Sequence, residues 1–183
     1  SFAKFFEKCI EDKATRKTRL SYETALKRMR EHDLLLDTRT FEDIDELYIK
    51  KLDEAWTKRG LSTTTKAVYF RNIRSVINDA IDENLTTSYA FRNFSIKKAP
   101  TKKRNLSVEE LRMLRDFPIV NEFQKKYRDI FMLCFYLRGI NAKDLLGLRK
   151  TNVRLNRINY IRAKTGKAYS VKIEPEAREL LNR

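Results

Sequence analysis

The spacing of apolar residues constrains the fold of this chain more than any other feature of its sequence. Large apolar side chains recur at intervals of three and four residues, which places them on one face of an α-helix. This spacing covers four stretches before residue 90, namely 2–10, 20–29, 41–56 and 67–81. We therefore predict four amphipathic helices whose apolar faces share one core. Gly60 is expected just past the end of the third helix, and Ser62 at the start of the fourth.

The helical pattern stops in a basic segment. Residues 92–104 contain six lysines and arginines, one proline and no acid, a composition typical of a linker. Helical spacing resumes over 107–116, where Ser107 and Glu110 have the spacing of a capping box that begins a helix. The sequence thus predicts a helical domain over 1–93, a basic linker over 94–105 and a second domain over 106–183.

The second domain changes from helical to strand periodicity. Helical spacing covers 121–137 and 141–148, whereas apolar and polar residues alternate over 158–162 and 169–173. Two alternating runs around a short glycine-containing turn predict a β-hairpin, and a further helix is expected after Pro175. We therefore expect a mainly α chain with a small antiparallel β-hairpin or sheet in its second half.

The net charge indicates a polyanionic partner. The 183 residues include 40 lysines and arginines against 25 aspartates and glutamates, a formal net charge of +15. Two tracts, 92–104 and 145–173, hold basic residues without any acid, and such residues gain affinity for phosphates by releasing counterions. A nucleic acid is the partner that we predict, with a plain solvated surface as the alternative for each tract.

Several other chemistries find no support in the sequence. Cys9 and Cys134 lie in apolar runs without metal-ligand spacing, and we expect them to be buried thiols of a cytosolic protein. His32, the only histidine, lies among polar residues and is expected at the surface. We predict no metal, no cofactor, no small-molecule ligand and no membrane span.

One set of residues resembles a known family. Residues 137–148 read Leu-Arg-Gly-Ile-Asn-Ala-Lys-Asp-Leu-Leu-Gly-Leu and precede Lys164 on the hairpin turn, which resembles the catalytic domain of the tyrosine recombinases, or phage integrases. That domain has a turn with an essential arginine, a nearby acidic residue, a leucine-rich helix and a hairpin lysine, in this order. The resemblance covers nearly the whole chain. It implies a SAM-like, four-helix core-binding domain followed by the N-terminal half of the catalytic domain.

The resemblance also implies the function of a longer protein. Tyrosine recombinases exchange DNA strands through a covalent 3′-phosphotyrosyl intermediate, with four protomers on two duplexes and no cofactor, and we expect this one in the bacterial cytoplasm. The family's His-x-x-Arg motif and nucleophilic tyrosine have no counterpart before Arg183. Tyr160 and Tyr169 lie on the predicted strands and are expected to be packing or edge residues. We therefore expect residues 1–183 to clamp duplex DNA at a core-type recombination site without cleaving it.

Arg138, Asp144 and Lys164 are the predicted catalytic residues. Aligned with the family pattern Gly-Leu-Arg-Ile-Ser-Glu, the chain has Asn141 at the usual arginine position and Asp144 at the acidic one. Arg138, just upstream, resembles the displaced arginine of conjugative-transposon integrases, and we expect it to neutralise charge on the scissile phosphate. Lys164 would protonate the leaving 5′ oxygen. The alternatives are that Arg138 pairs only with the DNA backbone or with Asp144, and that Lys164 only binds phosphate.

Further residues are predicted to contact DNA. The polar face of the fourth helix is expected to enter the major groove, with a solvated face as the alternative. The predicted contact residues are Lys66, Tyr69, Arg71 and Arg74 in that helix, Lys97, Lys98, Lys102, Lys103 and Arg104 in the linker, and Lys167 in the hairpin turn.

Two other functions fit the same features. A DNA-binding regulator or architectural protein would use the same clamp and never cut, and its complete gene would lack His-x-x-Arg and a downstream tyrosine. An RNA-binding helical protein would prefer RNA in competition with duplex DNA.

Overall fold

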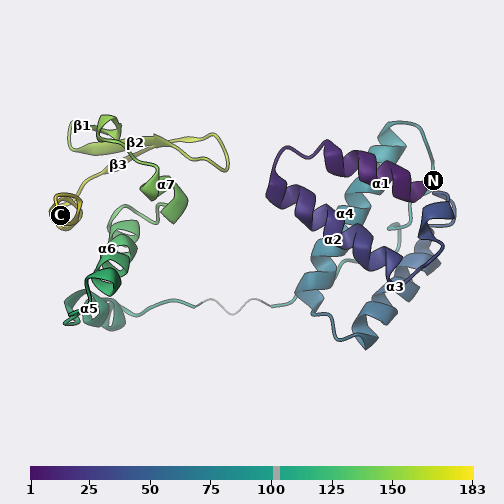
Figure 1. Ribbon diagram of the computed structural model, residues 1–183, viewed down its shortest axis with the longest axis horizontal. Helices are drawn as coiled ribbons and strands as arrows, with labels where there is room; N and C mark the ends of the chain where they lie inside the picture. The colour runs from purple at the N-terminus through teal and green to yellow at the C-terminus, as the bar shows by residue number, and fades with distance from the viewer. Residues whose placement is uncertain (101–103) are drawn as a thin grey trace. The chain divides into compact units, whose positions relative to one another are not determined.

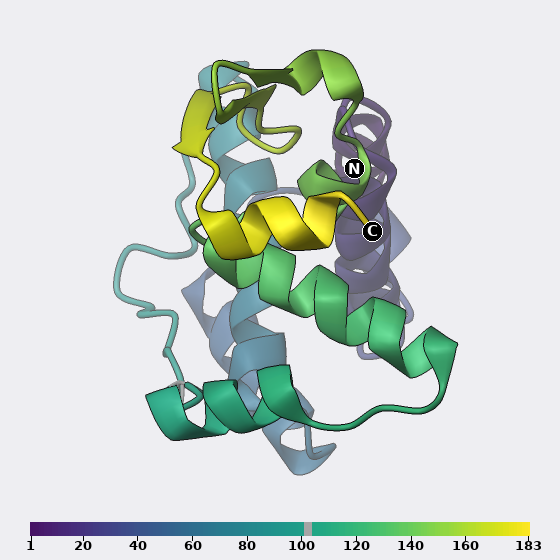
Figure 2. The same cartoon turned by 90° about the vertical axis from the view of Figure 1, so that its left-hand side faces the viewer.

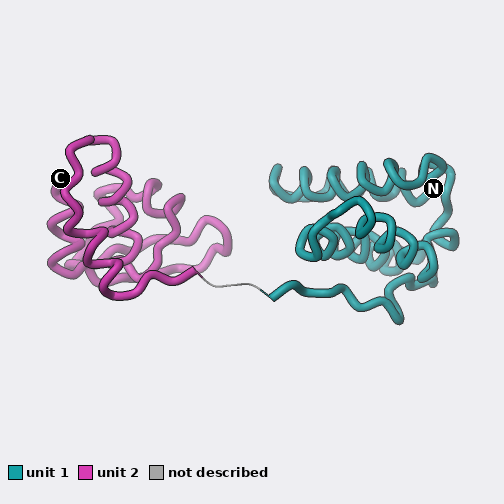
Figure 3. The backbone as a smooth tube through the Cα atoms, turned by 90° about the horizontal axis from the view of Figure 1, so that it is seen from below, with its two compact units in different colours: residues 1–102 teal, residues 103–183 magenta. Residues whose placement is uncertain are grey.

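The computed structural model describes residues 1–100 and 104–183, which belong to two compact units, residues 1–102 and residues 103–183. Figure 3 draws these units in different colours. Each unit has its own hydrophobic core, so each is described by itself below. No helix within the described ranges is both long and apolar enough to span a lipid bilayer.

All regular secondary structure in the described residues of the first unit is helical (Figure 1). They are α1 (Phe2–Glu11), α2 (Arg16–Arg30), the short 3-10 helix η1 (Leu36–Thr38), α3 (Glu46–Lys58) and α4 (Thr63–Asp82). α2 packs against both α1 and α4. The largest fully buried side chains of the shared core include Phe2, Phe6, Met29, Trp56 and Phe70. The prediction of four amphipathic helices around one core is therefore confirmed.

Local residues set the end of α3 and the start of α4. The Ser62 hydroxyl accepts a hydrogen bond from the Thr65 amide at 3.2 Å, which satisfies one of the free amides at the helix start. Gly60, just before it, has a φ of 77°, a left-handed conformation that favours glycine and ends α3. Both ends agree with the sequence-based expectation.

The start of α3 differs from that expectation. The Asp45 carboxylate accepts a hydrogen bond from the Tyr48 amide at 2.7 Å, so the helix begins at Glu46 and not near residue 41. Ile44 is buried from the turn before the helix, whereas Leu47, expected in the core, is 56% exposed. The apolar spacing continued across a cap, and the cap decided where the helix begins.

The second unit combines short helices with a small sheet. Its described elements are α5 (Val108–Asp116), α6 (Glu122–Tyr136), α7 (Ala142–Leu146), the 3-10 helix η2 (Lys150–Asn152), β1 (Val153–Arg154), β2 (Arg157–Ile161), β3 (Ala168–Lys172) and α8 (Pro175–Leu181). The predicted capping box is confirmed, because Ser107 and Glu110 each accept a hydrogen bond from the other's amide. The core lies between α6, α7, α8 and the sheet and includes Leu137, Ile140, Leu145, Ile158, Val171 and Ala177.

The sheet contains one strand more than the predicted hairpin. Its order is β1-β2-β3, and both pairs are antiparallel. β1 and β2 are joined by Leu155 and Asn156, whose φ values of 49° and 58° suit a tight two-residue turn. In the hairpin of β2 and β3, Ile158 faces Val171 and Tyr160 faces Tyr169. β1 has only two residues, too few to produce an alternating pattern in the sequence.

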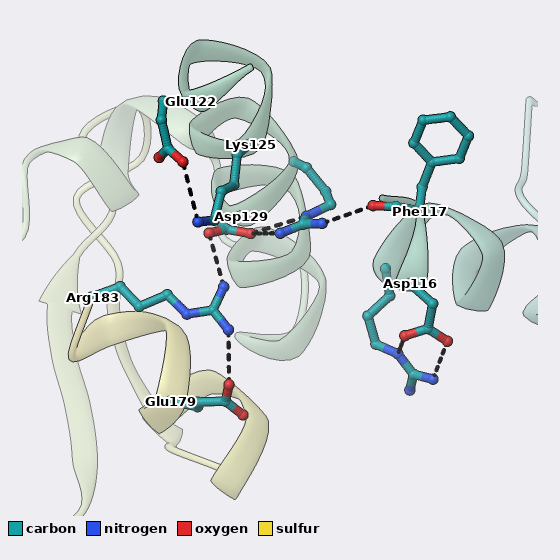
Figure 4. Close-up of polar contacts among 9 residues, drawn as sticks. Asp116, Phe117, Glu122, Lys125, Asp129, Glu179 and Arg183 are labelled. Atoms are coloured by element: carbon teal, nitrogen blue, oxygen red, sulfur yellow. Dashed lines mark hydrogen bonds and ion pairs between the residues drawn. The ribbon is translucent and has the colours of Figure 1, made fainter. Parts of the chain in front are cut away.

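α8 packs along α6, as Figures 1 and 2 show. An ion-pair network centred on Asp129 joins the two helices at the surface (Figure 4). Arg183 contacts Asp129 at 3.3 Å and Glu179 at 2.8 Å, and Arg128 contacts Asp129 at 3.0 Å. Arg128 also donates to the Phe117 carbonyl at 3.2 Å, so this network connects α6 to α8 and to the end of α5.

Candidate functional site

Arg138 lies in a tight turn at the end of α6. Its amide donates to the Phe135 carbonyl at 3.0 Å, and the Gly139 amide donates to the Cys134 carbonyl at 2.8 Å. Arg138 and Gly139 have φ values of 59° and 76°, and a positive φ is uncommon for a residue other than glycine. Leu137 before the turn is buried, whereas Arg138 is exposed. The turn therefore holds the Arg138 backbone firmly and leaves its guanidinium at the surface.

Asn141 has a structural task at the position where the family pattern has arginine. Its side-chain oxygen accepts a hydrogen bond from the Lys143 amide at 3.0 Å, and its backbone carbonyl accepts one from the Leu145 amide at 2.9 Å. Asn141 is thus the N-cap of α7, a position at which asparagine is strongly preferred. The side chain has no positive charge for a phosphate.

Asp144 connects α7 to the hairpin. Its Oδ1 atom accepts a hydrogen bond from the Ala163 amide at 3.0 Å. Ala163 directly precedes Lys164, so the carboxylate ties the start of the β2–β3 turn to the helix that follows the Arg138 turn. The alternative in which Arg138 pairs with Asp144 is not what the structure shows, because this carboxylate accepts from the Ala163 amide and forms no salt bridge with Arg138 within the described residues.

The β2–β3 turn presents Lys164 and Lys167 to solvent. The Arg162 amide donates to the Lys167 carbonyl at 2.8 Å, and the Gly166 amide donates to the Arg162 carbonyl at 2.9 Å. Gly166 has a φ of 66°, which closes the turn at a position that suits glycine. Both lysines are exposed. In the described part of the chain, no carboxylate forms a salt bridge with Lys164 or with Arg138.

The tyrosines of the hairpin are packing residues, as expected. The rings of Tyr160 and Tyr169 stack across the two strands with centroids 5.4 Å apart. Burial, followed by the nearby Asp144 carboxylate, raises the pKa of the Tyr160 phenol above its ordinary value. A raised pKa opposes formation of a phenolate, which is the opposite of what a nucleophile needs.

In the first unit, the prediction that Lys66 faces away from the core is wrong. Its side chain is buried, and its ammonium lies 2.6 Å from both an Asp53 carboxylate oxygen and the Thr57 hydroxyl. Lys66 is thus an ion-paired residue between α3 and α4, and this charge is not free for DNA. The pair escaped sequence reasoning because its members are separated by 13 positions.

The other predicted residues of α4 differ among themselves. Tyr69 is half-buried and makes an edge contact with Trp56, with ring centroids 5.5 Å apart. Arg71 is exposed, and Arg74 is half-exposed. The Arg71 guanidinium donates to the Ala67 carbonyl at 2.9 Å, so it has no carboxylate partner there. Arg71 and Arg74 therefore remain on the open side of α4, and Tyr69 lies at its edge.

Sequence reasoning missed a basic surface on α2. Arg16, Lys17 and Arg19 at the start of this helix are exposed, and residues 13–22 contain no acid. α2 lies beside α4, where Asn72 donates hydrogen bonds to both the carbonyl and the hydroxyl of Ser21. In the sequence this surface corresponds to an acid-free basic run that is shorter than the tracts 92–104 and 145–173.

The predicted linker is partly packed. The Phe94 ring packs against the Phe70 ring in a tilted arrangement, with ring centroids 4.9 Å apart, and Ile96 packs on the first core. Lys97, Lys98 and Arg104 are exposed. Lys102 and Lys103 lie outside the described residues.

No metal site is evident within residues 1–100 and 104–183, since no group of three or more His, Cys, Asp or Glu residues there is arranged to hold an ion. Cys9 is a buried free thiol, as expected, whereas Cys134 is a free thiol that is only half-buried. This partial burial raises the pKa of the Cys134 thiol.

Comparisons with known proteins agree with this architecture. Residues 1–98, more than half of the chain, match the phage integrase SAM-like domain family. None of the curated proteins compared with the chain matches it. Among solved structures, the Tn1549 transposon integrase in complex with a circular intermediate DNA has a TM-score of 0.75 and 15% identity, over 100% of this chain and 64% of that one.

Two lambda integrase structures are similar to the same extent. A tetramer bound to a Holliday junction gives a TM-score of 0.76 and 15% identity, over 98% of this chain and 51% of the integrase chain. A dimer bound to a COC′ core site gives a TM-score of 0.74 and 15% identity, over 99% of this chain and 66% of the integrase chain. At this identity the likeness is one of fold. The chain spans less than two thirds of the length of the Tn1549 integrase chain.

Proposed function

Because this chain belongs to the phage integrase family of tyrosine recombinases, we propose that it is part of a site-specific DNA recombinase that exchanges strands through a 3′-phosphotyrosyl intermediate. Residues 1–93 are the core-type DNA-binding domain, 94–105 the linker and 106–183 the first part of the catalytic domain. The integrases that share the fold are described in complexes with DNA, which supports duplex DNA as the partner.

The connection through Asp144 carries this proposal. Arg138 lies in the turn just before α7, and Lys164 follows the residue whose amide Asp144 binds at 3.0 Å. Two cationic side chains without salt-bridge partners in the described residues thus extend from two turns joined by one carboxylate. We propose that one phosphodiester group lies between them and meets both charges.

The two cations have different tasks in the reaction. Attack on a DNA phosphodiester builds negative charge on its non-bridging oxygens, and the Arg138 guanidinium neutralises that charge through paired hydrogen bonds. Lys164 gives a proton to the leaving 5′ oxygen, which suits an exposed lysine on a turn. Asp144 positions the Lys164 turn and does not touch the substrate.

DNA contact by the first unit involves the open sides of α2 and α4. Arg71 and Arg74 on α4 and the exposed cations at the start of α2 contact phosphates, while Lys66 stabilises the unit internally. Lys97, Lys98 and Arg104 in the linker and Lys167 in the hairpin turn add further phosphate contacts.

We further propose that residues 1–183 bind DNA without cleaving it. The nucleophilic tyrosine would come from the part of the integrase length that this chain does not span. The full-length protein would act in the bacterial cytoplasm as four protomers on two duplexes, as the lambda integrase tetramer on a Holliday junction suggests.

A suicide duplex tests the proposal. The full-length protein is incubated with a nicked duplex that carries the junction sequence of its element, and covalent protein–DNA adducts are counted on a denaturing gel. Residues 1–183, Arg138→Ala and Lys172→Ala are compared with it. Lys172 is a matched cation of the same unit that is paired with Glu174 at 3.1 Å, so its loss leaves adduct formation unchanged.

We expect an adduct from the full-length protein and from Lys172→Ala only. Binding without an adduct from the unsubstituted full-length protein would favour a DNA-binding regulator, and preference for RNA in competition would favour an RNA-binding protein. If the Arg138→Ala variant still formed the adduct, Arg138 would have no role in the reaction.

A further inference from the structure

The segment between α2 and α3 displays leucines that the first core does not use. In the run of three leucines over 34–36, only Leu36 is buried, whereas Leu34 and Leu35 are 91% and 62% exposed. Leu47, near the start of α3, is 56% exposed and lines one hollow together with residues 32 and 33. These exposed leucines are therefore neighbours, and a local apolar group on a surface indicates an interaction.

The turn that carries Leu34 and Leu35 is held firmly. The Asp33 carboxylate accepts hydrogen bonds from the Leu35 amide at 3.0 Å and from the Arg39 guanidinium at 2.9 Å. The Asp33 amide donates to the Met29 carbonyl at 2.8 Å. Because the turn is already ordered, a partner that covers its leucines loses little conformational entropy there.

The same part of the first unit is acidic in an otherwise basic chain. Residues 31–54 hold nine aspartates and glutamates against three lysines and arginines, whereas the remaining residues hold 16 against 37. The exposed acids of this segment are Asp37, Glu42, Asp43, Asp45 and Glu54. Within the described residues, only Asp37 among these five forms a salt bridge. Most of this negative charge is thus not neutralised by the chain itself.

A hollow of about 330 Å³ lies in this acidic region. Asp43 and Asp45 line it, as do the cations Arg39 and Lys51. Arg39 is paired with Asp33 at 2.9 Å, so two carboxylates face one remaining cation. The hollow therefore favours a positively charged group.

The hollow also contains an unpaired polar group. The Tyr48 hydroxyl, in its lining, is buried and makes no hydrogen bond of acceptable geometry within residues 1–100 and 104–183. Buried hydroxyls are normally paired, and a phenol oxygen can accept a hydrogen bond from a cationic side chain. A lysine or arginine that enters the hollow would meet the two carboxylates and bring a donor to this hydroxyl.

The charge and the leucines together identify the class of occupant. Exposed carboxylates repel nucleic acid and anionic membrane surfaces. No group of three or more His, Cys, Asp or Glu residues in the described part of the chain is arranged to hold a metal ion. A small cation would also leave the leucines uncovered. A protein segment with both basic and apolar side chains satisfies both features.

A different protein fits this surface better than a second copy of the chain. The proposed function assigns the cations at the start of α2, on α4, in the linker and in the hairpin turn to DNA phosphates. Their charge is not available to a neighbouring copy while DNA is bound. A partner whose basic segment does not contact DNA has its charge free for the carboxylates.

We infer that Leu34, Leu35, Leu47, Asp43 and Asp45, the acidic leucine surface, form a docking site for a basic segment of another protein. One lysine or arginine of that segment enters the hollow, and its apolar side chains cover the leucines. Burial of the leucines stabilises the complex, and charge complementarity sets its orientation. This inference goes beyond the proposed function, since no residue of the surface is assigned there to DNA or to the reaction.

A library of random short peptides displayed on phage tests the inference. The library is selected on immobilised residues 1–183, with the soluble double variant Leu34→Ser, Asp43→Asn as competitor to remove peptides that bind elsewhere. We expect the enriched peptides to have a net positive charge and at least one large apolar side chain. Enrichment of neutral or acidic peptides, or no enrichment over the competitor, would overturn the inference.

Single variants then locate the bound peptide. Leu34→Ser and Asp43→Asn should each weaken the binding of an enriched peptide, measured by calorimetry, at least about tenfold. Asn at position 43 keeps an oxygen for the Thr40 amide, which Asp43 binds at 2.8 Å. Leu20→Ser and Glu23→Gln change an exposed leucine and an exposed acid elsewhere on the first unit and should alter affinity by less than about twofold. Equal effects in test and control variants would contradict the assignment.

Two further outcomes would identify another occupant. If residues 1–183 self-associated in light scattering and Leu34→Ser made them monomeric, a second copy would cover the surface and the inference would fail. If Leu34→Ser weakened duplex DNA binding, the leucines would belong to the DNA interface. The full-length Leu34→Ser and Asp43→Asn variants should form the DNA adduct at the unsubstituted level, so the peptide test and the adduct test can fail independently.

Discussion

The Asp144 carboxylate accepts a hydrogen bond from the Ala163 amide at 3.0 Å, across 19 positions of sequence. This contact joins the helix after the Arg138 turn to the hairpin turn that carries Lys164. Asp144 is half-buried, and hydrogen bonds to a charged group are stronger than neutral ones. The relative position of the two proposed catalytic cations thus depends on one side chain that itself bears the opposite charge.

Asp144→Ala should loosen the hairpin turn. Loss of the acceptor is expected to cost about 1–2 kcal/mol locally, so hydrogen exchange at the Ala163 amide should speed up and adduct formation by the full-length protein should fall. Asp144→Asn keeps an oxygen at the same place and should restore much of the protection. If both variants exchanged at the native rate, the contact would have no role in holding the turn.

Lys66→Ala should destabilise the first unit and leave DNA contacts unchanged. The substitution leaves the Asp53 carboxylate half-buried without its 2.6 Å partner, which is expected to cost about 1–3 kcal/mol. Trp56 is the only tryptophan and lies in this core, so its fluorescence during urea unfolding reports on this unit. If Lys66→Ala instead had the stability of the native chain and a weaker salt dependence of DNA binding, Lys66 would be a DNA contact.

Lys17→Ala and Arg71→Ala should each weaken DNA binding by residues 1–183 in a salt-dependent way. The slope of log K against log salt should decrease by about 0.9 for each phosphate contact that is lost. Arg30→Ala is the matched control, because Arg30 pairs with Glu7 and Asp37 at 2.7 Å and should leave the slope unchanged. Equal slopes for all three variants would exclude α2 and α4 from the interface.

Alkaline pH should destabilise the first unit through Cys9. Burial, with a smaller effect from the Asp79 carboxylate, raises the pKa of this thiol from 9.0 to about 11. A raised pKa means that the stability is fully present below pH 9 and is lost as the pH rises toward 11, because the unfolded chain ionises first. Urea unfolding at pH 8 and pH 10 should show a larger loss for the native chain than for Cys9→Ala. Parallel losses in both proteins would assign the effect to other groups.

Local rules in the sequence determined most of the secondary structure. The three-and-four spacing of apolar residues, the Ser62 cap, Gly60 and the Ser107–Glu110 capping box each act within one or two turns of chain, so their consequences could be predicted. The hairpin of β2 and β3 followed from alternation in the same way. The resemblance that identified Arg138, Asp144 and Lys164 also relied on spacing along the chain.

Only the tertiary structure decided which polar groups of distant segments meet. The sequence placed Lys66 on a polar face, and packing of α3 on α4 brought it to Asp53 instead. Packing likewise brought Asp144 to Ala163 and left aromatic side chains of α6, such as Phe123 and Phe135, exposed. Helical periodicity and capping are short-range effects of backbone geometry, whereas an ion pair or a covered face depends on the positions of segments that the spacing of neighbouring residues does not encode.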